Sequence, residues 1–191
     1  MSCTWVFGLG ILPSCAVKTV RFELAVYLFT YHAYRSWNAD HRRGYTRKDD
    51  GVLPPDEQMA DFYDRNAKQP AVEFDQAMQA VLIAGAADVC RHRDWRFHAA
   101  GTDPTHGHFL ISWKEFAPWN DVSDKLKNLL SLFLGRLANE TGRRWFSAQQ
   151  SRKRVTAQAH FDFLVARYLP DQRGLSWTEG EALPEIPDGI L

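Results

Sequence analysis

Two histidines separated by one glycine, His106-Gly107-His108, carry the first chemical signal in the sequence. In a β-strand, residues two apart project from the same face, so the two imidazoles would point the same way. A neutral imidazole binds many divalent metals, and the pair does not choose among magnesium, manganese and zinc. Taken alone, the pattern fits two half-exposed strand histidines without a ligand better than it fits a metal site.

A second candidate is Tyr168, which stands near the end of a helix predicted over residues 156–169. Apolar residues one and two turns earlier place it on or beside the apolar face of that helix. The same spacing fits a core tyrosine whose hydroxyl reaches the rim. Gln172 follows four residues later, where a continuous helix would bring it beneath the same site. Pro170 opposes that continuity, because it disfavours helix at the preceding residue and lacks a backbone donor.

Basic residues form clusters, although Lys plus Arg and Asp plus Glu each number 23 and the formal net charge is zero. A nucleic-acid partner would therefore have to be bound by local patches rather than by total charge. Trp145 and Phe146 lie among these cations and offer stacking surfaces for unpaired bases. Each cluster taken alone also fits a solvated surface. The residues expected to contact DNA are Arg42, Arg43, Arg144, Arg152, Lys153 and Arg154.

The chain of 191 residues suits one domain with a core of its own. Cys3, Cys15 and Cys90 have no metal-type or disulfide-type spacing, which favours a reducing compartment. The apolar run 5–12 lacks a preceding cation and is too short to cross a membrane, so an N-terminal extension is favoured over a signal peptide. We expect an extension over residues 1–20, one domain over 21–177 and a loose acidic tail over 178–191.

Hydrophobic periodicity predicts strands and helices in mixed order. Strands are expected over residues 22–37, 95–100 and 106–113, with a turn at 101–104. Helices are expected over 73–93, after Pro70, and over 121–141, with Asp121 or Ser123 as its N-cap and Gly142 as its C-cap glycine. Residues 38–56 are expected to be an excursion or long loop, and 145–155 a basic hairpin with its tip at 147–150. This order predicts an α+β fold, an antiparallel sheet with helices covering one face.

Taken together, these segments resemble the single-tyrosine HUH transposases, the family that includes the REP-associated tyrosine transposases. The similarity runs in the same order along residues 22–177, and order is what makes it specific. It rests on residues 31–37 with Arg42-Arg43-Gly44, on 103–111 around the histidines, on Lys125-Leu126-Lys127, on the basic Ser151-Arg152-Lys153-Arg154-Val155, and on Tyr168-Leu169-Pro170-Asp171-Gln172.

The resemblance implies a ferredoxin-like or RRM-like sheet and a chemistry. Tyr168 would attack a DNA phosphodiester, giving a 5′-phosphotyrosine and a free 3′-hydroxyl. His106, His108 and Gln172 would hold Mg²⁺ or Mn²⁺, which makes up for the weak nucleophilicity of a phenol. The partner would be single-stranded DNA at hairpin or repeat ends, without a membrane. A homodimer is compatible with the family, and the location would be cytoplasmic and nucleoid-associated.

The sequence departs from the family in three places, and two other functions stay open. Gly107 replaces the bulky apolar residue that usually separates the histidines, and glycine weakens a strand. Pro170 puts Gln172 in doubt, so Asp171 could be the third ligand. Asp103 or His160 could serve as ligand or base. The alternatives are a catalytically silent DNA- or RNA-binding module on the same sheet and an unrelated metallohydrolase that uses the two histidines and an acid such as Asp103.

Overall fold

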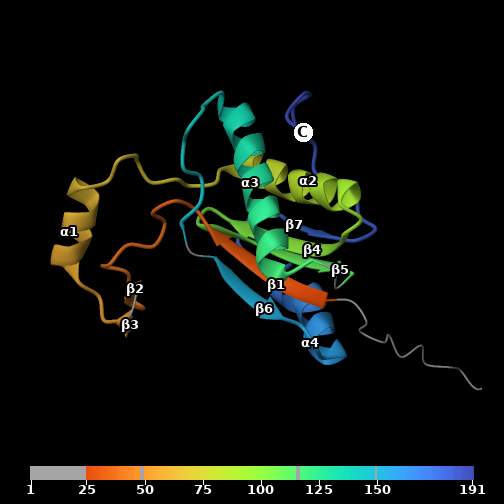
Figure 1. Cartoon of the computed structure of the whole chain (residues 1–191), viewed down its shortest axis with the longest axis horizontal. Helices are drawn as coiled ribbons and strands as arrows, with labels where there is room; N and C mark the ends of the chain where they lie inside the picture. The colour runs from red at the N-terminus through yellow and green to blue at the C-terminus, as the bar shows by residue number, and fades with distance from the viewer. Residues whose placement is uncertain (1–24, 48–49, 115–116, 149) are drawn as a thin grey trace, which may run out of the picture.

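A five-stranded antiparallel sheet forms the centre of the computed structural model, which describes residues 25–191 except 48–49, 115–116 and 149. The strands lie in the order β6-β1-β5-β4-β7 (Figure 1). Their bounds are β1 Ala25–His32, β4 Arg96–Asp103, β5 His106–Trp113, β6 Ser151–Arg154 and β7 Ser176–Thr178. The long strands β1, β5 and β4 are adjacent, and the short strands β6 and β7 form the two edges.

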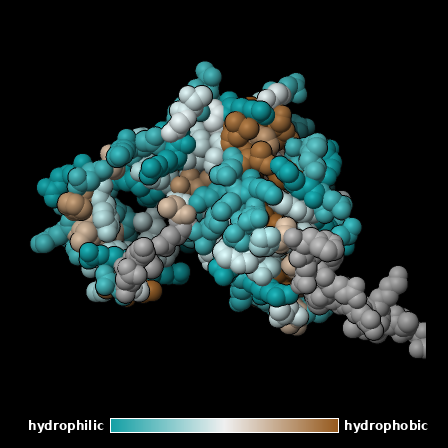
Figure 2. Space-filling model, viewed as in Figure 1, coloured by the Kyte–Doolittle hydropathy of each residue, from teal (hydrophilic) through white to brown (hydrophobic). Residues whose placement is uncertain are grey.

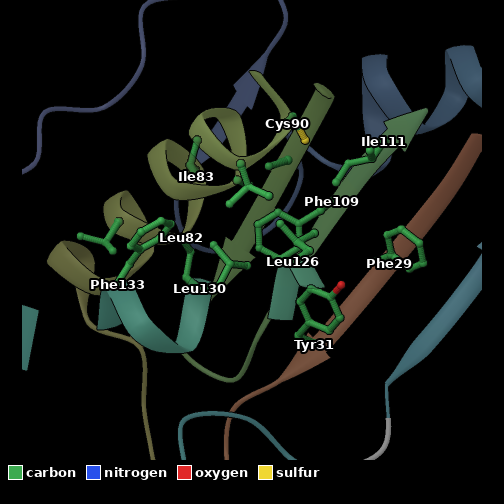
Figure 3. Packing of buried hydrophobic residues seen from close by; sticks show 14 of the residues in the cluster. Phe29, Tyr31, Leu82, Ile83, Cys90, Phe109, Ile111, Leu126, Leu130 and Phe133 are labelled. Carbon is green, nitrogen blue, oxygen red and sulfur yellow. The ribbon is translucent and has the colours of Figure 1, made fainter. Parts of the chain in front are cut away.

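Two long helices cover the first face of the sheet. These are α2, Gln76–His92, and α3, Trp119–Ala138, which contact each other and run in different directions in Figure 1. Alternate residues of β1 and β5, including Phe29, Tyr31 and Phe109, point to this face and are fully buried against the helices (Figure 3). This cluster is the main core, because it holds most of the large buried side chains.

A shorter helix covers the second face. The α-helix α4, Gln158–Phe163, continues as a π-helical turn, η1, Leu164–Tyr168. Leu164 and Leu169 pack here on Leu28 of β1, Ala99 of β4 and Leu110 of β5. The predicted α+β fold with an antiparallel sheet is confirmed, with helices on both faces where one was expected.

Residues 38–65 leave the sheet and form a separate lobe, which we call the excursion. It contains the hairpin β2, Tyr45–Arg47, and β3, Gly51–Leu53, followed by α1, Glu57–Arg65 (Figure 1). The segment 38–56, predicted to be an excursion or long loop, is therefore an excursion that contains a short hairpin. The excursion buries Ala39, Tyr45 and Ala60 in a small cluster of its own. Strands of three residues carry too little alternation to be detected in the sequence.

Several predicted boundaries are corrected by the structure. β1 ends at His32 rather than at residue 37, and β4 continues through the predicted turn to Asp103. The N-cap of α2 is Asp75, five residues beyond Pro70. Helix α3 begins after Pro118 and ends at Ala138, and its C-cap residue is the left-handed Asn139 rather than Gly142.

Two C-terminal segments also differ from expectation. Residues 145–155 do not form a hairpin, because β6 pairs with β1 and Phe146 forms an isolated bridge with Ala33. Residues 178–191 are not a loose tail, because Ile190 is 8% exposed and packs on the main core. Its carbonyl accepts a hydrogen bond from Arg136. The apolar run 5–12 and the start of the first predicted strand lie outside the described residues. In the part of the chain that is described, no helix combines the length and apolar character needed to cross a membrane.

Candidate active site

The two histidines of the sequence pattern lie at the start of β5 and share the second face of the sheet. His108 is paired with Thr30 of β1 on one side and with Gly101 of β4 on the other. His106 is likewise paired with His32 and Asp103. The rings of His106 and His108 are close, with centroids 4.6 Å apart. The strand spacing thus brings both imidazoles to one place, as expected.

Hydrogen bonds to Nδ1 orient both rings. Nδ1 of His108 lies 2.7 Å from Oγ1 of Thr30, and Nδ1 of His106 lies 2.8 Å from Oγ1 of Thr105. The carboxylate of Asp103 is 3.0 Å from the same His106 nitrogen. With Nδ1 engaged, Nε2 is the ring nitrogen left to each histidine for a ligand. A hydroxyl or carboxylate behind the imidazole is the usual arrangement for metal-binding histidines.

Burial keeps these imidazoles neutral. It lowers the pKa of His108 to about 3, with further contributions from neighbouring His106 and His32. Burial also lowers the pKa of His106 and of His32. A histidine must be neutral to donate its ring nitrogen to a metal. At neutral pH the cluster therefore presents unprotonated nitrogens.

Asp103 supports the cluster from the end of β4. Its Oδ1 accepts hydrogen bonds from the backbone N–H of Thr105 at 2.6 Å and of His106 at 2.9 Å. Partial burial works to raise the pKa of this carboxyl, but the hydrogen bonds from Thr105 and the nearby His106 outweigh it, and the pKa lies below its ordinary value. Asp103 therefore fixes the turn that precedes His106 and is an ionised acceptor for its ring.

Tyr168 reaches the same site from the helical layer. Its hydroxyl lies 3.2 Å from Nε2 of His108, the ring nitrogen that Thr30 leaves available. The tyrosine and histidine pair is therefore brought together within one chain. Burial and the charge of Asp103 raise the pKa of Tyr168. A phenol with a raised pKa is a weak nucleophile at neutral pH and requires activation.

A change of helical register places this hydroxyl. The N–H of Leu169 donates to the carbonyl of Leu164 at 3.0 Å, the five-residue spacing of a π-helix. Single π-helical turns often occur at functional sites. Pro170 follows without a backbone donor, and Nε2 of Gln172 donates to the carbonyl of Tyr168 at 2.7 Å. Gln172 thus lies next to the tyrosine despite Pro170, and its Oε1 is the atom left for a ligand. Asp171 is exposed.

Gly101 allows the end of this helix to approach the sheet. A Cβ at Gly101 would lie 2.3 Å from the carbonyl oxygen of Leu169 and 2.7 Å from Cγ of Gln172. Because Gly101 is the β4 partner of His108, this close approach brings the segment after Tyr168 directly over the histidines. The sequence pattern assigned Gly101 to a turn, whereas its role is to leave room for backbone in a strand.

Packing also explains why a glycine stands at position 107. It points to the first face of the sheet, and a Cβ there would lie 3.0 Å from the ring of Phe109. The Phe109 ring therefore covers the position that a bulky residue would occupy. The residue between the histidines is small here because its neighbour on the same strand fills the space.

The predicted DNA-binding residues fall on different surfaces. Arg42 and Arg43 are exposed on the turn of the excursion, and Arg144 is exposed before β6. Within β6, Lys153 pairs with Leu28 and so shares the histidine face. Arg152 instead pairs with Phe29, and its guanidinium lies 3.5 Å from the ring centre of Trp119 of α3. Arg154 has the same strand orientation as Arg152. Side chains alternate along β6, so Lys153 lies on the histidine face and Arg152 and Arg154 lie on the opposite face.

Two further expectations are settled by burial and distance. Trp145 and Phe146 are 3% and 7% exposed, so they are core residues and not stacking surfaces for bases. Their clustering with cations was misleading, because the chain turns inward there to bridge Ala33. His160 lies on α4, and among the described residues no hydrogen bond or ring contact joins it to the histidine pair or Tyr168.

A cleft opens beside the histidines, between the excursion and the β1–β6 edge of the sheet. It has a volume of about 500 Å³. Figure 2 shows the surface hollowed between the excursion and the body of the protein. The cleft is lined by His32, Trp37, Asn38, Ala39, Tyr45, Tyr63, Ser147, Ala148, Gln150 and Ser151. His32 connects it to the site, since its ring centroid lies 5.4 Å from that of His106. Thr30 and His32 were missed in the sequence because only the strand register brings them here. The cleft aromatics Trp37 and Tyr63 are placed instead by the packing of the excursion.

Two neutral imidazoles and an amide oxygen have the donor chemistry that a divalent ion accepts. Within the described residues, no group of three or more His, Cys, Asp or Glu side chains is arranged to hold a metal. A site that consists of two histidines and a glutamine has only two residues of these four types, so it is not such a group. The two neutral rings, each supported at Nδ1, are suited to this role. His106, His108 and Gln172 are therefore the residues that could hold the ion.

No protein-family model matches the sequence, and no curated protein matches it. Among solved structures, the fold is similar to that of a REP-associated tyrosine transposase bound to a REP hairpin, with 9% identity and a TM-score of 0.39. That match covers 72% of this chain and 59% of the other. A "putative transposase" from Deinococcus radiodurans R1 matches with 12% identity and a TM-score of 0.40, over 90% of this chain and 100% of the other. At these values neither likeness bears on what this chain binds or does.

Proposed function

We propose that this protein cleaves and rejoins single-stranded DNA, with Tyr168 as the nucleophile and His106 and His108 as ligands of a divalent metal. The observation that carries the proposal is the 3.2 Å contact between the Tyr168 hydroxyl and Nε2 of His108. A nucleophile must lie beside the groups that activate it. The phenol oxygen lies beside the ring nitrogen that would hold the ion, so a phosphate polarised by the ion would meet Tyr168.

The proposed reaction is an in-line displacement at phosphorus. The Tyr168 oxygen bonds to the phosphorus as the bond to the 3′ oxygen breaks, and the departing electron pair stays on that oxygen. The phenolic proton is lost and the 3′ oxygen gains a proton, which leaves a free 3′-hydroxyl and a 5′-phosphotyrosine. Because the ester link is conserved, a 3′-hydroxyl can attack it and restore a DNA strand without an external energy source.

Mg²⁺ or Mn²⁺, when bound, would polarise the scissile phosphate and stabilise the charge that develops on it. His106 and His108 would hold the ion, with Gln172 as the third ligand. Thr30 orients the His108 ring through its contact with Nδ1 of that ring, and Asp103 orients the His106 ring in the same way. Gln172 also holds the Tyr168 carbonyl, so one side chain would link the nucleophile to the ligand set.

Single-stranded DNA is the proposed substrate, from hairpin or repeat ends. Lys153 on the histidine face, Arg42 and Arg43 on the excursion, and Arg144 before β6 would neutralise phosphates. The contribution of Arg152 is expected to be smaller, because its guanidinium is already engaged on Trp119. The proposal requires no second copy at the site and no membrane, and it is compatible with a cytoplasmic, nucleoid-associated protein.

A covalent-adduct assay tests the chemistry. The wild-type chain is incubated with end-labelled hairpin DNAs that carry single-stranded tails, with Mn²⁺, Mg²⁺ or EDTA, and resolved on a denaturing gel. We expect a metal-dependent protein–DNA band that is absent in Tyr168→Phe and in His108→Ala. The variant Tyr27→Phe keeps its ring, which packs with Phe29 on the first face of the sheet, away from the histidines. It serves as a matched control and should still form the adduct.

The alternatives give different results in the same assay. Tight binding without an adduct on any hairpin would contradict the proposal and indicate a silent DNA-binding module. Metal-dependent cleavage that survives Tyr168→Phe would indicate a metallohydrolase in which the histidines act without the tyrosine.

A further inference from the structure

We propose that the cleft between the excursion and the β1–β6 edge binds one unpaired base of a single-stranded DNA by stacking. This inference rests on the proposed function for the identity of the substrate and adds a site for a nucleotide next to the reacting phosphate. The cleft, at about 500 Å³, lies within the usual size range of small-ligand pockets.

The lining favours a neutral planar group over a phosphate. Four of the ten lining residues that the structure describes have rings, and none of these ten is Asp, Glu, Lys or Arg. A phosphate would require cations or converging N–H groups, whereas a base needs aromatic faces and a few polar atoms. The lining chemistry thus fits the base, while the exposed Arg42 and Arg43 on the adjoining turn are placed to meet the backbone of the strand.

The Trp37 ring is both immobilised and exposed, which suits it for stacking on a base. It remains 42% exposed although it is fixed on several sides. Its Nε1 donates to the carbonyl of Gly44 at 2.8 Å, and His41 stacks on one face with ring centroids 3.7 Å apart. An aromatic ring that is already immobilised loses little entropy when it stacks on a ligand. The exposed part of the Trp37 ring is therefore available for a base to stack on.

Tyr63 faces the same cleft from α1. It is 39% exposed, and its neighbour Asp64 joins α1 to the exit of β1 through an ion pair with Arg35 and a 2.9 Å hydrogen bond from Asn38. Arg35 adopts a left-handed backbone conformation with φ of 60°. These contacts place Tyr63 opposite the body of the protein rather than leaving α1 as an independent lobe.

A buried polar atom supports the same conclusion. Oε1 of Gln150 has no hydrogen-bond partner among the described residues, although its Nε2 donates to Asp124 at 2.9 Å. Gln150 lines the cleft. An unsatisfied buried acceptor is costly. A turn of the Gln150 side chain would bring Oε1 into the cleft, where an N–H of a base would satisfy it. Because His32 connects this cleft to His106, the base would belong to a nucleotide close to the scissile phosphate.

The test separates stacking from phosphate binding. Fluorescence anisotropy measures binding of the Tyr168→Phe chain, which cannot form the adduct, to labelled oligo(dT) and to an abasic oligomer of the same length. We expect Tyr63→Ala to weaken oligo(dT) binding by about 5- to 100-fold and to leave binding of the abasic oligomer unchanged. Phe62→Ala, an exposed ring beside Tyr63 that does not line the cleft, is the matched control and should bind as the parent does.

A second measurement keeps the inference testable if Tyr63→Ala disturbs α1. Oligo(dT) carrying 5-iodo-deoxyuridine is cross-linked by light to the otherwise unaltered protein, and the modified peptides are mapped by mass spectrometry. Cross-links on Trp37 or Tyr63 support the inference; cross-links confined to other surfaces overturn it. Equal losses for oligo(dT) and the abasic oligomer would also overturn it. An adduct at Tyr168 with no effect of the cleft variants would leave the proposed function standing, whereas cleft binding without an adduct would reject only the chemistry.

Discussion

The hydroxyl of Thr30 lies 2.7 Å from Nδ1 of His108, and this contact turns the opposite nitrogen of the ring toward Tyr168. The two residues belong to different strands and are 78 positions apart in the chain. The β1–β5 register makes them direct neighbours. Thr30 is therefore a positioning residue for the whole site.

Replacing Thr30 with valine keeps the shape of the side chain and removes the hydroxyl. We expect the affinity for Mn²⁺ and the rate of adduct formation to fall by about 10- to 100-fold, because a supporting hydrogen bond behind a metal-bound histidine is lost. Calorimetric Mn²⁺ titration and the gel assay measure the two effects. Thr30→Ser should restore both, and equal values for valine and threonine would show that the contact has no role.

Gly101→Ala should disturb the tyrosine helix. The new Cβ would meet the carbonyl of Leu169 at 2.3 Å, so the end of the helix must move away from the sheet. We expect a loss of about 1–3 kcal/mol in the free energy of unfolding, measured with urea, and a slower adduct reaction. Gly107→Ala is the matched comparison, because its Cβ meets the edge of a ring at 3.0 Å on the opposite face. It should cost less stability, and a reversed order would refute this account of Gly101.

Acid should destabilise the protein in metal-free buffer. Burial lowers the pKa of His108 to about 3, so the unfolded chain takes up this proton near pH 6.5 and the folded chain does not. Stability is therefore lost as pH falls from about 6.5 toward 3, by about 2 kcal/mol at pH 5 from this residue. Burial lowers the pKa of His98 as well, which adds in the same direction.

Urea unfolding in EDTA at pH 7.5 and at pH 5 measures this loss. The difference in unfolding free energy between the two pH values should shrink in His108→Gln, because glutamine does not titrate. A stability that stays constant over this range would contradict the assignment of neutral, buried histidines.

Because Tyr168 and His108 meet within one chain, two inactive variants should not rescue each other. We expect a mixture of Tyr168→Phe and His108→Ala proteins to form no adduct at any ratio. Sites built from a tyrosine helix donated by a partner chain would recover activity in the mixture. Adduct formation by the mixed variants would therefore show exchange between two copies.

The histidine pair and the long elements could be predicted from the sequence by itself. The spacing of His106 and His108 follows from the two-residue period of a strand, and β5 has the predicted bounds. The apolar periods of α2 and α3 run over enough turns to be detected from residue types alone. These features depend on neighbours in the chain, so local pattern is sufficient to find them.

Tertiary structure alone decided what surrounds those residues. The pairing of β1 with β5 brings Thr30 and His32 to the histidines, and a helix packed over Gly101 delivers Tyr168. Strand register, a shift from α- to π-helical spacing, and the placement of the excursion each depend on contacts between segments far apart in the chain. Burial, which holds the pKa of His108 low, exists only once those segments have packed.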